Sequence, residues 1–157
     1  MEGTGPECTP AARALLMGGG PARPYWPHVP GQGWVSDGGA LLLRALLRSY
    51  HGRRSAFGHP ADYESAVNGR GVPDDGTGDP GVLLRRGTAF ARSVLAAAER
   101  DVPGRSVTAR ISVAPVLDSP QEHTGYVTFA SSRYAGERLR WTLEGDGPVV
   151  LLRGPGV

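Results

Sequence analysis

The sequence SVTARISV, residues 106–113, decides the fold class of this chain. Its apolar residues alternate with polar ones, so a strand would turn one set toward a buried sheet face and the other toward water. The same alternation recurs at Leu139, Trp141 and Leu143, which stand between polar residues. The segments between such stretches are short, and short connections favour antiparallel pairing. The C-terminal third therefore predicts an antiparallel sheet.

Four strands are expected in this region. In chain order they are residues 105–117, 125–131, 137–144 and 148–152. We expect each strand to pair with the next, which gives an antiparallel meander of three or four strands. A sheet with one apolar face needs a cover on that face, and the chain offers apolar helices upstream of it.

Two helices are expected before the sheet. The first, at residues 39–50, is apolar around most of its circumference, with Ser36 and Asp37 as candidate N-caps. The second, at residues 81–100, follows Asp79-Pro80, a capping residue and a proline whose missing N–H costs nothing in the first turn. The predicted fold class is therefore α+β, with two main helices packed on the C-terminal meander.

The first 35 residues are unusually rich in glycine and proline. We expect residues 1–35 to form a loop-rich arm, flexible or extended, and residues 36–157 to form a single α+β domain. The single cysteine, Cys8, cannot form an internal disulfide, which fits a reducing compartment. No apolar run is long enough for a signal-peptide core or a membrane span. The sequence thus predicts a soluble, cytoplasmic protein.

The basic residues show a compositional bias. All 17 are arginine, and the chain has no lysine, which we attribute to the codon usage of a high-GC bacterial genome. The formal net charge is +2, with 15 acidic residues interspersed. This balance is too mild to indicate nucleic-acid binding, which usually shows as a clustered basic face. A membrane partner is not expected either.

One short segment carries residue types that can transfer protons. His59 would share a helical face with Asp62 or Tyr63, and burial moves a carboxylate pKa toward neutrality. These three residues are the catalytic candidates, although solvated polar side chains explain the same pattern without catalysis. The chain has no nucleotide-binding fingerprint, nucleophile elbow or zinc-protease spacing, so we expect no cofactor and no metal.

The acidic run at residues 74–79 has the composition of a calcium-binding loop. An EF-hand needs a glutamate at its twelfth position, and counting from Asp74 or Asp75 that position holds Arg85 or Arg86. We therefore expect a solvated loop that ends in the cap of the second helix.

Two features could bind a protein partner. Adjacent aromatic residues between prolines, Tyr25 and Trp26, either pack on the domain or form an exposed recognition motif. A basic cluster near the end of the first expected helix either complements the helix dipole or forms an anion site. The cluster consists of Arg44, Arg48, Arg53 and Arg54.

The lack of a catalytic motif beside a well-patterned scaffold favours a non-catalytic interaction or regulatory protein that binds a protein partner. The alternative is a small-molecule-binding protein or enzyme with a pocket between helices and sheet. A cavity lined by polar groups would favour the alternative, and a filled core would count against it. The sequence does not decide whether the protein is an enzyme, what it binds, its strand order or its oligomeric state.

Overall fold

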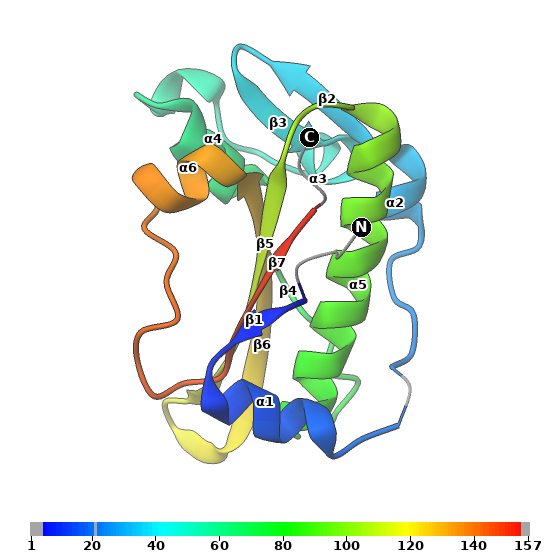
Figure 1. Ribbon diagram of the computed structural model, residues 1–157, viewed down its shortest axis with the longest axis vertical. Coiled ribbons are helices and arrows are strands. Elements are labelled where there is room, and N and C mark those ends of the chain that lie inside the picture. Colours follow the sequence, from blue (N-terminus) through cyan, green and yellow to red (C-terminus); the bar gives the residue numbers. More distant parts are fainter. Residues whose placement is uncertain (1–4, 21, 155–157) are drawn as a thin grey trace.

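Two antiparallel sheets and six α-helices make up the part of the chain described in this computed structural model, residues 5–20 and 22–154 (Figure 1). The strands are β1 (Glu7–Cys8), β2 (Trp34–Asp37), β3 (Ala40–Leu43), β4 (Arg70–Gly71), β5 (Val107–Val116), β6 (Ser119–Ser131) and β7 (Val149–Arg153). The helices are α1 (Pro10–Met17), α2 (His28–Gln32), α3 (Arg44–Arg48), α4 (Pro60–Val67), α5 (Pro80–Asp101) and α6 (Ser132–Glu137), with a 3₁₀ turn at Arg54–Ala56. The fold is mixed α+β, as the sequence predicts.

The larger sheet has the strand order β1-β7-β5-β6-β4. β5 and β6 form a long hairpin whose register shifts between Pro115 and Val116. β7 pairs with the other edge of β5, so that Arg110 lies opposite Leu151. The sheet is antiparallel as expected, but the meander is only partly present, because the last strand returns to β5 and not to its neighbour in sequence.

The strand expected at residues 137–144 does not form. α6 ends at Glu137, and Arg140 then adopts φ +53°, a left-handed conformation that interrupts extended backbone. The backbone N–H of Trp141 donates to the carbonyl oxygen of Ala135 at 2.8 Å. The alternating apolar residues of this stretch are therefore half-buried in a loop.

The helix expected at residues 39–50 does not form; this segment contains the strand β3 followed by the short helix α3. β2 and β3 form a hairpin around Gly38 and Gly39, whose φ values are +54° and +87°. Two consecutive positive φ values are typical of tight hairpin turns, and glycine adopts them without a steric cost. Ser36 and Asp37, the expected N-caps, lie in β2. Residues 41–43 are buried in β3. A short apolar run suits a buried strand as well as a helix, which is why the sequence pattern alone does not predict the strand.

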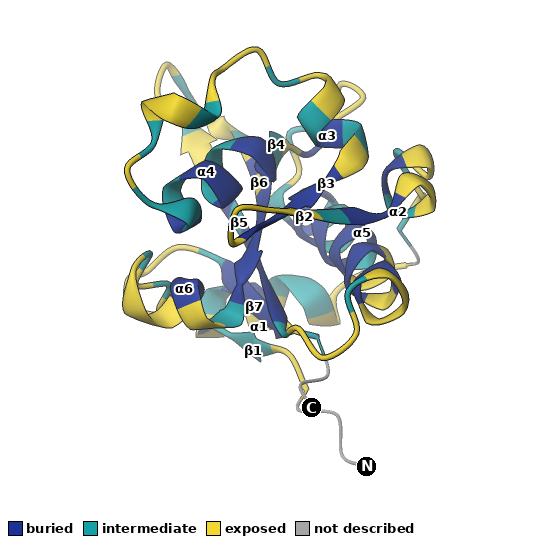
Figure 2. Cartoon of the chain, turned by 90° about the horizontal axis from the view of Figure 1, so that it is seen from above, coloured by how far each residue is buried: buried dark blue, intermediate teal, exposed yellow. Residues whose placement is uncertain are grey.

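The second expected helix is confirmed as α5. Asp79 caps it, since its Oδ1 accepts a hydrogen bond from the N–H of Val82 at 3.0 Å. The helix lies along one face of the larger sheet, while α6 lies on the other side (Figures 1 and 2). A Cβ at Gly87 would stand 2.7 Å from Cγ2 of Ile111, so the helix backbone rests directly on β5. The space between α5 and the sheet is filled at this crossing.

The N-terminal segment contributes three elements to the described structure. β1 pairs with β7, and α1, capped by Thr9, packs against α5. α2 contacts both α3 and α5. The division of the chain near residue 35 stays a prediction. None of the helices in residues 5–20 and 22–154 combines the length and the apolar character needed to cross a membrane.

Candidate binding site

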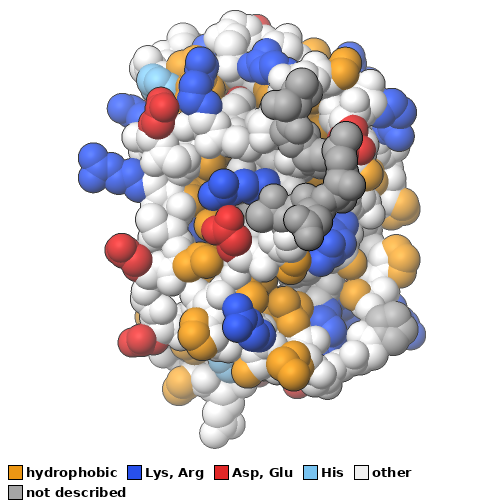
Figure 3. Space-filling view, viewed as in Figure 1, with side chains coloured by type: hydrophobic (Ala, Val, Ile, Leu, Met, Phe, Trp, Pro, Cys, Tyr) orange, Lys and Arg blue, Asp and Glu red, His pale blue; other side chains and the backbone are white. Residues whose placement is uncertain are grey.

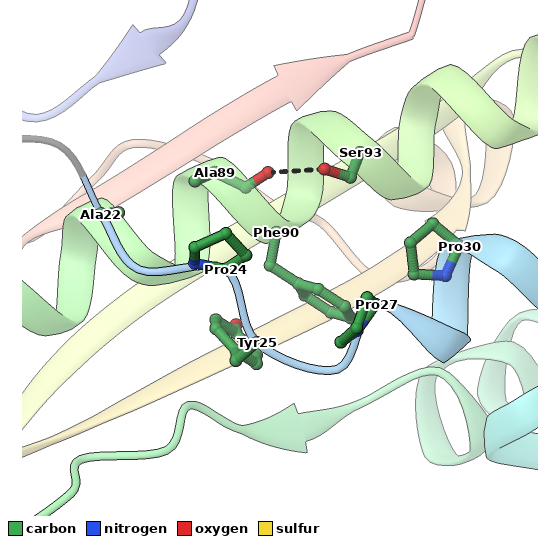
Figure 4. Close-up of a pocket in the computed structure, with 8 residues that line it drawn as sticks. All are labelled: Ala22, Pro24, Tyr25, Pro27, Pro30, Ala89, Phe90 and Ser93. Carbon is green, nitrogen blue, oxygen red and sulfur yellow. Dashed lines mark hydrogen bonds between the residues drawn. The ribbon is translucent and has the colours of Figure 1, made fainter.

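An apolar groove of about 190 Å³ lies between residues 22–30 and α5 (Figure 4). Its lining residues are Ala22, Pro24, Tyr25, Pro27, Pro30, Ala89, Phe90 and Ser93. The hydroxyl of Ser93 donates back to the carbonyl oxygen of Ala89 at 3.3 Å, as the dashed line in Figure 4 marks. The groove therefore presents mainly proline, alanine and aromatic carbon.

Phe90 fixes one wall of the groove. The ring of Tyr25 stacks on it with centroids 4.7 Å apart and an interplanar angle of 28°. Trp26 meets the same ring edge-on at 6.0 Å. Burial raises the pKa of the Tyr25 phenol, although the nearby Arg86 acts in the opposite direction. Of the two sequence-based alternatives, the structure shows the one in which both rings pack on the domain.

Three exposed arginines are adjacent to lining residues of the groove, in sequence or in space. Arg23 stands between the lining residues Ala22 and Pro24, and Arg92 directly precedes Ser93 on α5. Arg100 Nη2 lies 3.5 Å from the carbonyl oxygen of Pro30. One carboxylate is nearby, since Asp101 Oδ1 pairs with Arg100 Nε at 3.4 Å. We call Arg23, Arg92 and Arg100 the basic rim, because Arg100 contacts a lining residue and the other two are exposed sequence neighbours of lining residues.

The four arginines of the predicted basic cluster contact different neighbours. Arg48 donates to Gln32 Oε1 at 3.0 Å. Arg54 donates to the carbonyl oxygen of Gly38 at 3.3 Å and lies 4.9 Å from the ring centroid of Tyr63. Arg44 and Arg53 are exposed. None of the four lines the groove, and their shared role in partner binding stays a prediction.

The catalytic candidates lie on one segment, but each has a separate partner. His59 Nδ1 accepts a hydrogen bond from the N–H of Ala61 at 3.0 Å and so caps α4. Asp62 Oδ2 accepts one from Arg138 Nη2 at 2.9 Å, which lowers the pKa of this carboxyl group. Tyr63 is buried, and burial raises the pKa of its phenol. The contacts of His59 and Asp62 join structural elements, and no shared reaction centre emerges from them.

The buried acid that sequence reasoning left out of the site is Glu64, which is 0% exposed. Its Oε1 accepts hydrogen bonds from the N–H of Leu41 and the hydroxyl of Ser131, both at 2.7 Å, and its Oε2 accepts one from the N–H of Ser131 at 2.9 Å. Burial raises the pKa of Glu64, and these hydrogen bonds oppose the rise. In the sequence, the burial of Glu64 is indicated only by its position next to apolar residues of the helix.

The acidic run at residues 74–79 uses its carboxylates locally. Asp74 Oδ1 accepts a hydrogen bond from the N–H of Gly76 at 3.0 Å, and Asp75 Oδ2 pairs with Arg86 Nη1 at 3.3 Å. Asp79 caps α5. Across residues 5–20 and 22–154, no three side chains of His, Cys, Asp or Glu come together closely enough to hold a metal ion.

Charge is spread over the surface. On the face shown in Figure 3, basic side chains stand apart from one another, with acidic side chains among them. We argue a function on the apolar groove with its basic rim. Comparisons with protein-family models, with curated proteins and with solved structures found no match to this chain.

Proposed function

We propose that this chain is a non-catalytic interaction protein that binds a segment of a partner protein in the groove between residues 22–30 and α5. The proposed partner segment carries an apolar or aromatic anchor residue flanked by Asp or Glu. One observation carries the proposal: an aromatic-walled apolar groove whose rim carries exposed arginines.

The size of the groove favours a side chain over a whole ligand. Small-molecule sites usually enclose about 300–1,000 Å³, and this groove has about 190 Å³. That volume suits one large apolar side chain presented by a longer segment.

The energetics require more than the anchor. Complete burial of one large apolar side chain contributes about 1.5–3 kcal/mol, whereas micromolar affinity needs about 8 kcal/mol. The segment that carries the anchor must therefore make further contacts. The arginines of the rim are available for acidic flanking residues, and such charges add mostly to association rate and specificity.

The catalytic candidates give this proposal indirect support. His59 caps a helix and Asp62 forms an ion pair with Arg138, so neither side chain is free of a structural contact. In the described part of the chain, the space between α5 and the sheet is filled where Gly87 crosses β5. Binding on the surface agrees with these contacts better than chemistry in a buried site.

A matched pair of substitutions at helix positions tests the groove. Ala89→Glu puts a longer, acidic side chain into the groove, while Ala14→Glu makes the same change at an exposed position of α1 outside the lining. The probes are peptides selected from a random display library on the wild-type protein, with affinities measured by fluorescence anisotropy. We expect the selected peptides to share an apolar residue flanked by Asp or Glu.

We expect Ala89→Glu to weaken the binding of these peptides by about tenfold or more, and Ala14→Glu to change their affinity by less than about twofold. Peptides that bind Ala89→Glu as well as the wild type would overturn the proposed site. A library that yields no binding peptide would contradict the proposed function itself.

The residues predicted from the sequence enter the same assay. Because Tyr25 forms part of the groove wall, we expect Tyr25→Ala to weaken the selected peptides. Arg44→Gln and Arg53→Gln show whether the exposed members of the basic cluster contribute. A loss confined to Tyr25→Ala would restrict the site to the groove.

A further inference from the structure

A second hollow, of about 300 Å³, lies on the face of the larger sheet opposite to α5. Thr108 and Leu151 line it from the sheet, Ser132 lines it from α6, and Trp141 and Arg153 complete it. We propose that this hollow binds a small molecule with one anionic group, a carboxylate or a phosphate, and a planar ring. The anion meets Arg153 and a chain of hydroxyl groups, and the ring lies against Trp141.

The register of the sheet shows why these residues meet. On β5, the alternate residues Ala109 and Ile111 face α5 and are fully buried, so Thr108 and Arg110 face the other way. Thr108 pairs directly with Arg153 of β7. A hydroxyl group and a guanidinium group therefore stand side by side on the outer face, under α6.

Three hydroxyl groups form a chain along the hollow. Ser132 Oγ lies 2.7 Å from Ser106 Oγ and 2.8 Å from Thr108 Oγ1. Three hydroxyls carry three protons, and the two hydrogen bonds between them use two. The third proton has no protein acceptor among the described residues. Thr108 and Ser132 line the hollow and Ser106 does not, so the chain donates to an anion when Thr108 or Ser132 carries this proton.

The charged residues of the lining favour a single negative charge on the ligand. Arg133 and Arg153 contribute two guanidinium groups, and Glu137 contributes one carboxylate. The side chain of Arg153 is 59% exposed, and its Nη2 forms an ion pair with Glu7 Oε1 at 3.6 Å, a separation longer than a hydrogen bond. A bound anion would therefore compete with the Glu7 carboxylate for this guanidinium group. Its donors are available to a carboxylate or a phosphate, which a guanidinium binds through two parallel hydrogen bonds.

Arg133 is held at the edge of the hollow. Its Nη2 donates to the hydroxyl of Tyr134 at 2.8 Å, and its guanidinium lies 4.7 Å from the centroid of that ring. Arg110 adds positive charge from the sheet, since it is partly buried and forms no ion pair within the described residues. It is the diagonal neighbour of Arg153 across the β5–β7 pair.

Trp141 supplies the planar surface. Its backbone N–H donates to Ala135 at 2.8 Å, which ties the loop to α6, and its ring is partly exposed. Aromatic rings pack favourably on one another in offset or edge-on arrangements. A hollow of about 300 Å³ is at the small end of the range for ligand sites, so the ligand is of the size of a substituted benzene ring.

Calorimetric titration of the full chain tests the site. Phenyl phosphate and benzoate probe the two anionic groups, inorganic phosphate carries the charge without the ring, and benzyl alcohol carries the ring without the charge. We expect phenyl phosphate or benzoate to bind with a Kd of about 1 mM or lower, and the two single-feature probes to bind at least about tenfold more weakly. The stronger of the first two identifies the anionic group.

The matched variants are Arg153→Gln, inside the hollow, and Arg140→Gln, an exposed arginine of the loop that is not in the lining. We expect Arg153→Gln to weaken the best probe by about tenfold or more, because charged hydrogen bonds are lost. Arg140→Gln leaves its affinity within about twofold. If Arg153→Gln fails to fold, Ser132→Ala, which breaks the hydroxyl chain, replaces it with the same expectation.

Three outcomes would overturn the proposal. They are the absence of saturable binding by both ring-bearing anions, equal affinity for inorganic phosphate and phenyl phosphate, and equal losses in the Arg153 and Arg140 variants. The site lies across the sheet from α5, so Ala89→Glu should leave it intact. The two binding proposals can therefore fail separately.

Discussion

Glu64 of α4 and Asn68, the C-cap residue of that helix, lie one turn apart and together bind the backbones of two strands that belong to different sheets. Glu64 accepts hydrogen bonds from the N–H groups of Leu41 and Ser131 at 2.7 and 2.9 Å. Asn68 Nδ2 donates to the carbonyl oxygens of Leu41 and Phe129 at 2.8 and 3.2 Å. Leu41 lies in β3, and the other two lie in β6. The two side chains thus form hydrogen bonds with backbone groups of both strands, as a neighbouring strand would do in a sheet.

We expect Glu64→Ala to lower the free energy of unfolding by about 3 kcal/mol or more. It leaves the buried N–H groups of Leu41 and Ser131 without acceptors, at about 1–3 kcal/mol each. Glu99→Ala, at an exposed glutamate, should cost less than about 0.5 kcal/mol. Urea unfolding measures the free energy of unfolding of both variants. Equal losses would contradict a stabilising role of the buried Glu64 carboxylate.

The titration of Glu64 should show in the pH dependence of stability. Burial raises its pKa above the ordinary value of 4.5, so the folded protein keeps this proton at pH values where the unfolded chain has lost it. Its contribution is therefore full below the ordinary pKa and is lost as the pH rises through the folded value. We expect the stability of the wild type relative to Glu64→Gln to fall as the pH rises from the ordinary value of 4.5 through the raised pKa of the folded protein. A difference that increases over this range would contradict the raised pKa.

We expect Gly87→Ala to destabilise the protein by about 1–3 kcal/mol through overpacking. The new Cβ would stand 2.7 Å from Cγ2 of Ile111 and 3.1 Å from Cγ2 of Val127. Alanine usually brings a gain of about 1 kcal/mol to a helix, so the net loss after this gain is up to about 2 kcal/mol. Gly136→Ala in α6 is the control, because its Cβ would meet nothing within 4 Å. Thermal unfolding should show opposite or clearly different shifts for the two variants.

The ion pair between Asp62 and Arg138 should affect titration more than stability. The hydrogen bond from Arg138 holds the pKa of Asp62 below 3.8, its ordinary value. We expect Arg138→Gln to return the pKa of Asp62 to about its ordinary value, as measured by an NMR titration of the Asp62 carboxyl carbon. The unfolding midpoint should change little. Arg140→Gln should leave the titration unchanged. An Asp62 pKa that does not respond to Arg138→Gln would assign the lowering to another group.

The elements that the sequence predicts well are those whose local signals agree. α5 begins at Pro80 behind the Asp79 cap, and its apolar positions follow one helical stripe. β5 alternates from Val107 to Val113, and the apolar residues that the alternation assigns to the core are buried; Thr108 of the polar set is buried as well, on the other face. In both cases a local signal, the helix cap or the spacing of the apolar residues, predicts the element without information about distant residues.

The segments that were predicted wrongly carry ambiguous signals. Residues 41–43 are three consecutive leucines, which fit a buried strand as well as a helix, and the two glycines before them decide for a hairpin. The alternation at residues 139–143 resembles a strand, but β7 occupies the edge of β5 where another strand could pair. Pairing partners are a tertiary property, so a single sequence does not determine them.

The candidate groove was predictable only in part. Tyr25 stands out in the sequence because it lies between prolines next to Trp26, and it does line the groove. Phe90 belongs to the expected apolar stripe of the second helix, and nothing in the sequence shows that its ring meets Tyr25. The hollow on the other face depends on Arg153 and Thr108 becoming neighbours across two strands, which local patterns do not reveal.

The pairing of β1 with β7 has a consequence for synthesis. Cys8 lies opposite Val150, and β7 fills the place between β1 and β5. During synthesis, one edge of β5 therefore has no partner strand until residues 149–153 have left the ribosome. An unpaired strand edge is a template for association with other chains. A nascent chain that lacks residues 149–153 therefore exposes an edge of β5 that the folded protein covers.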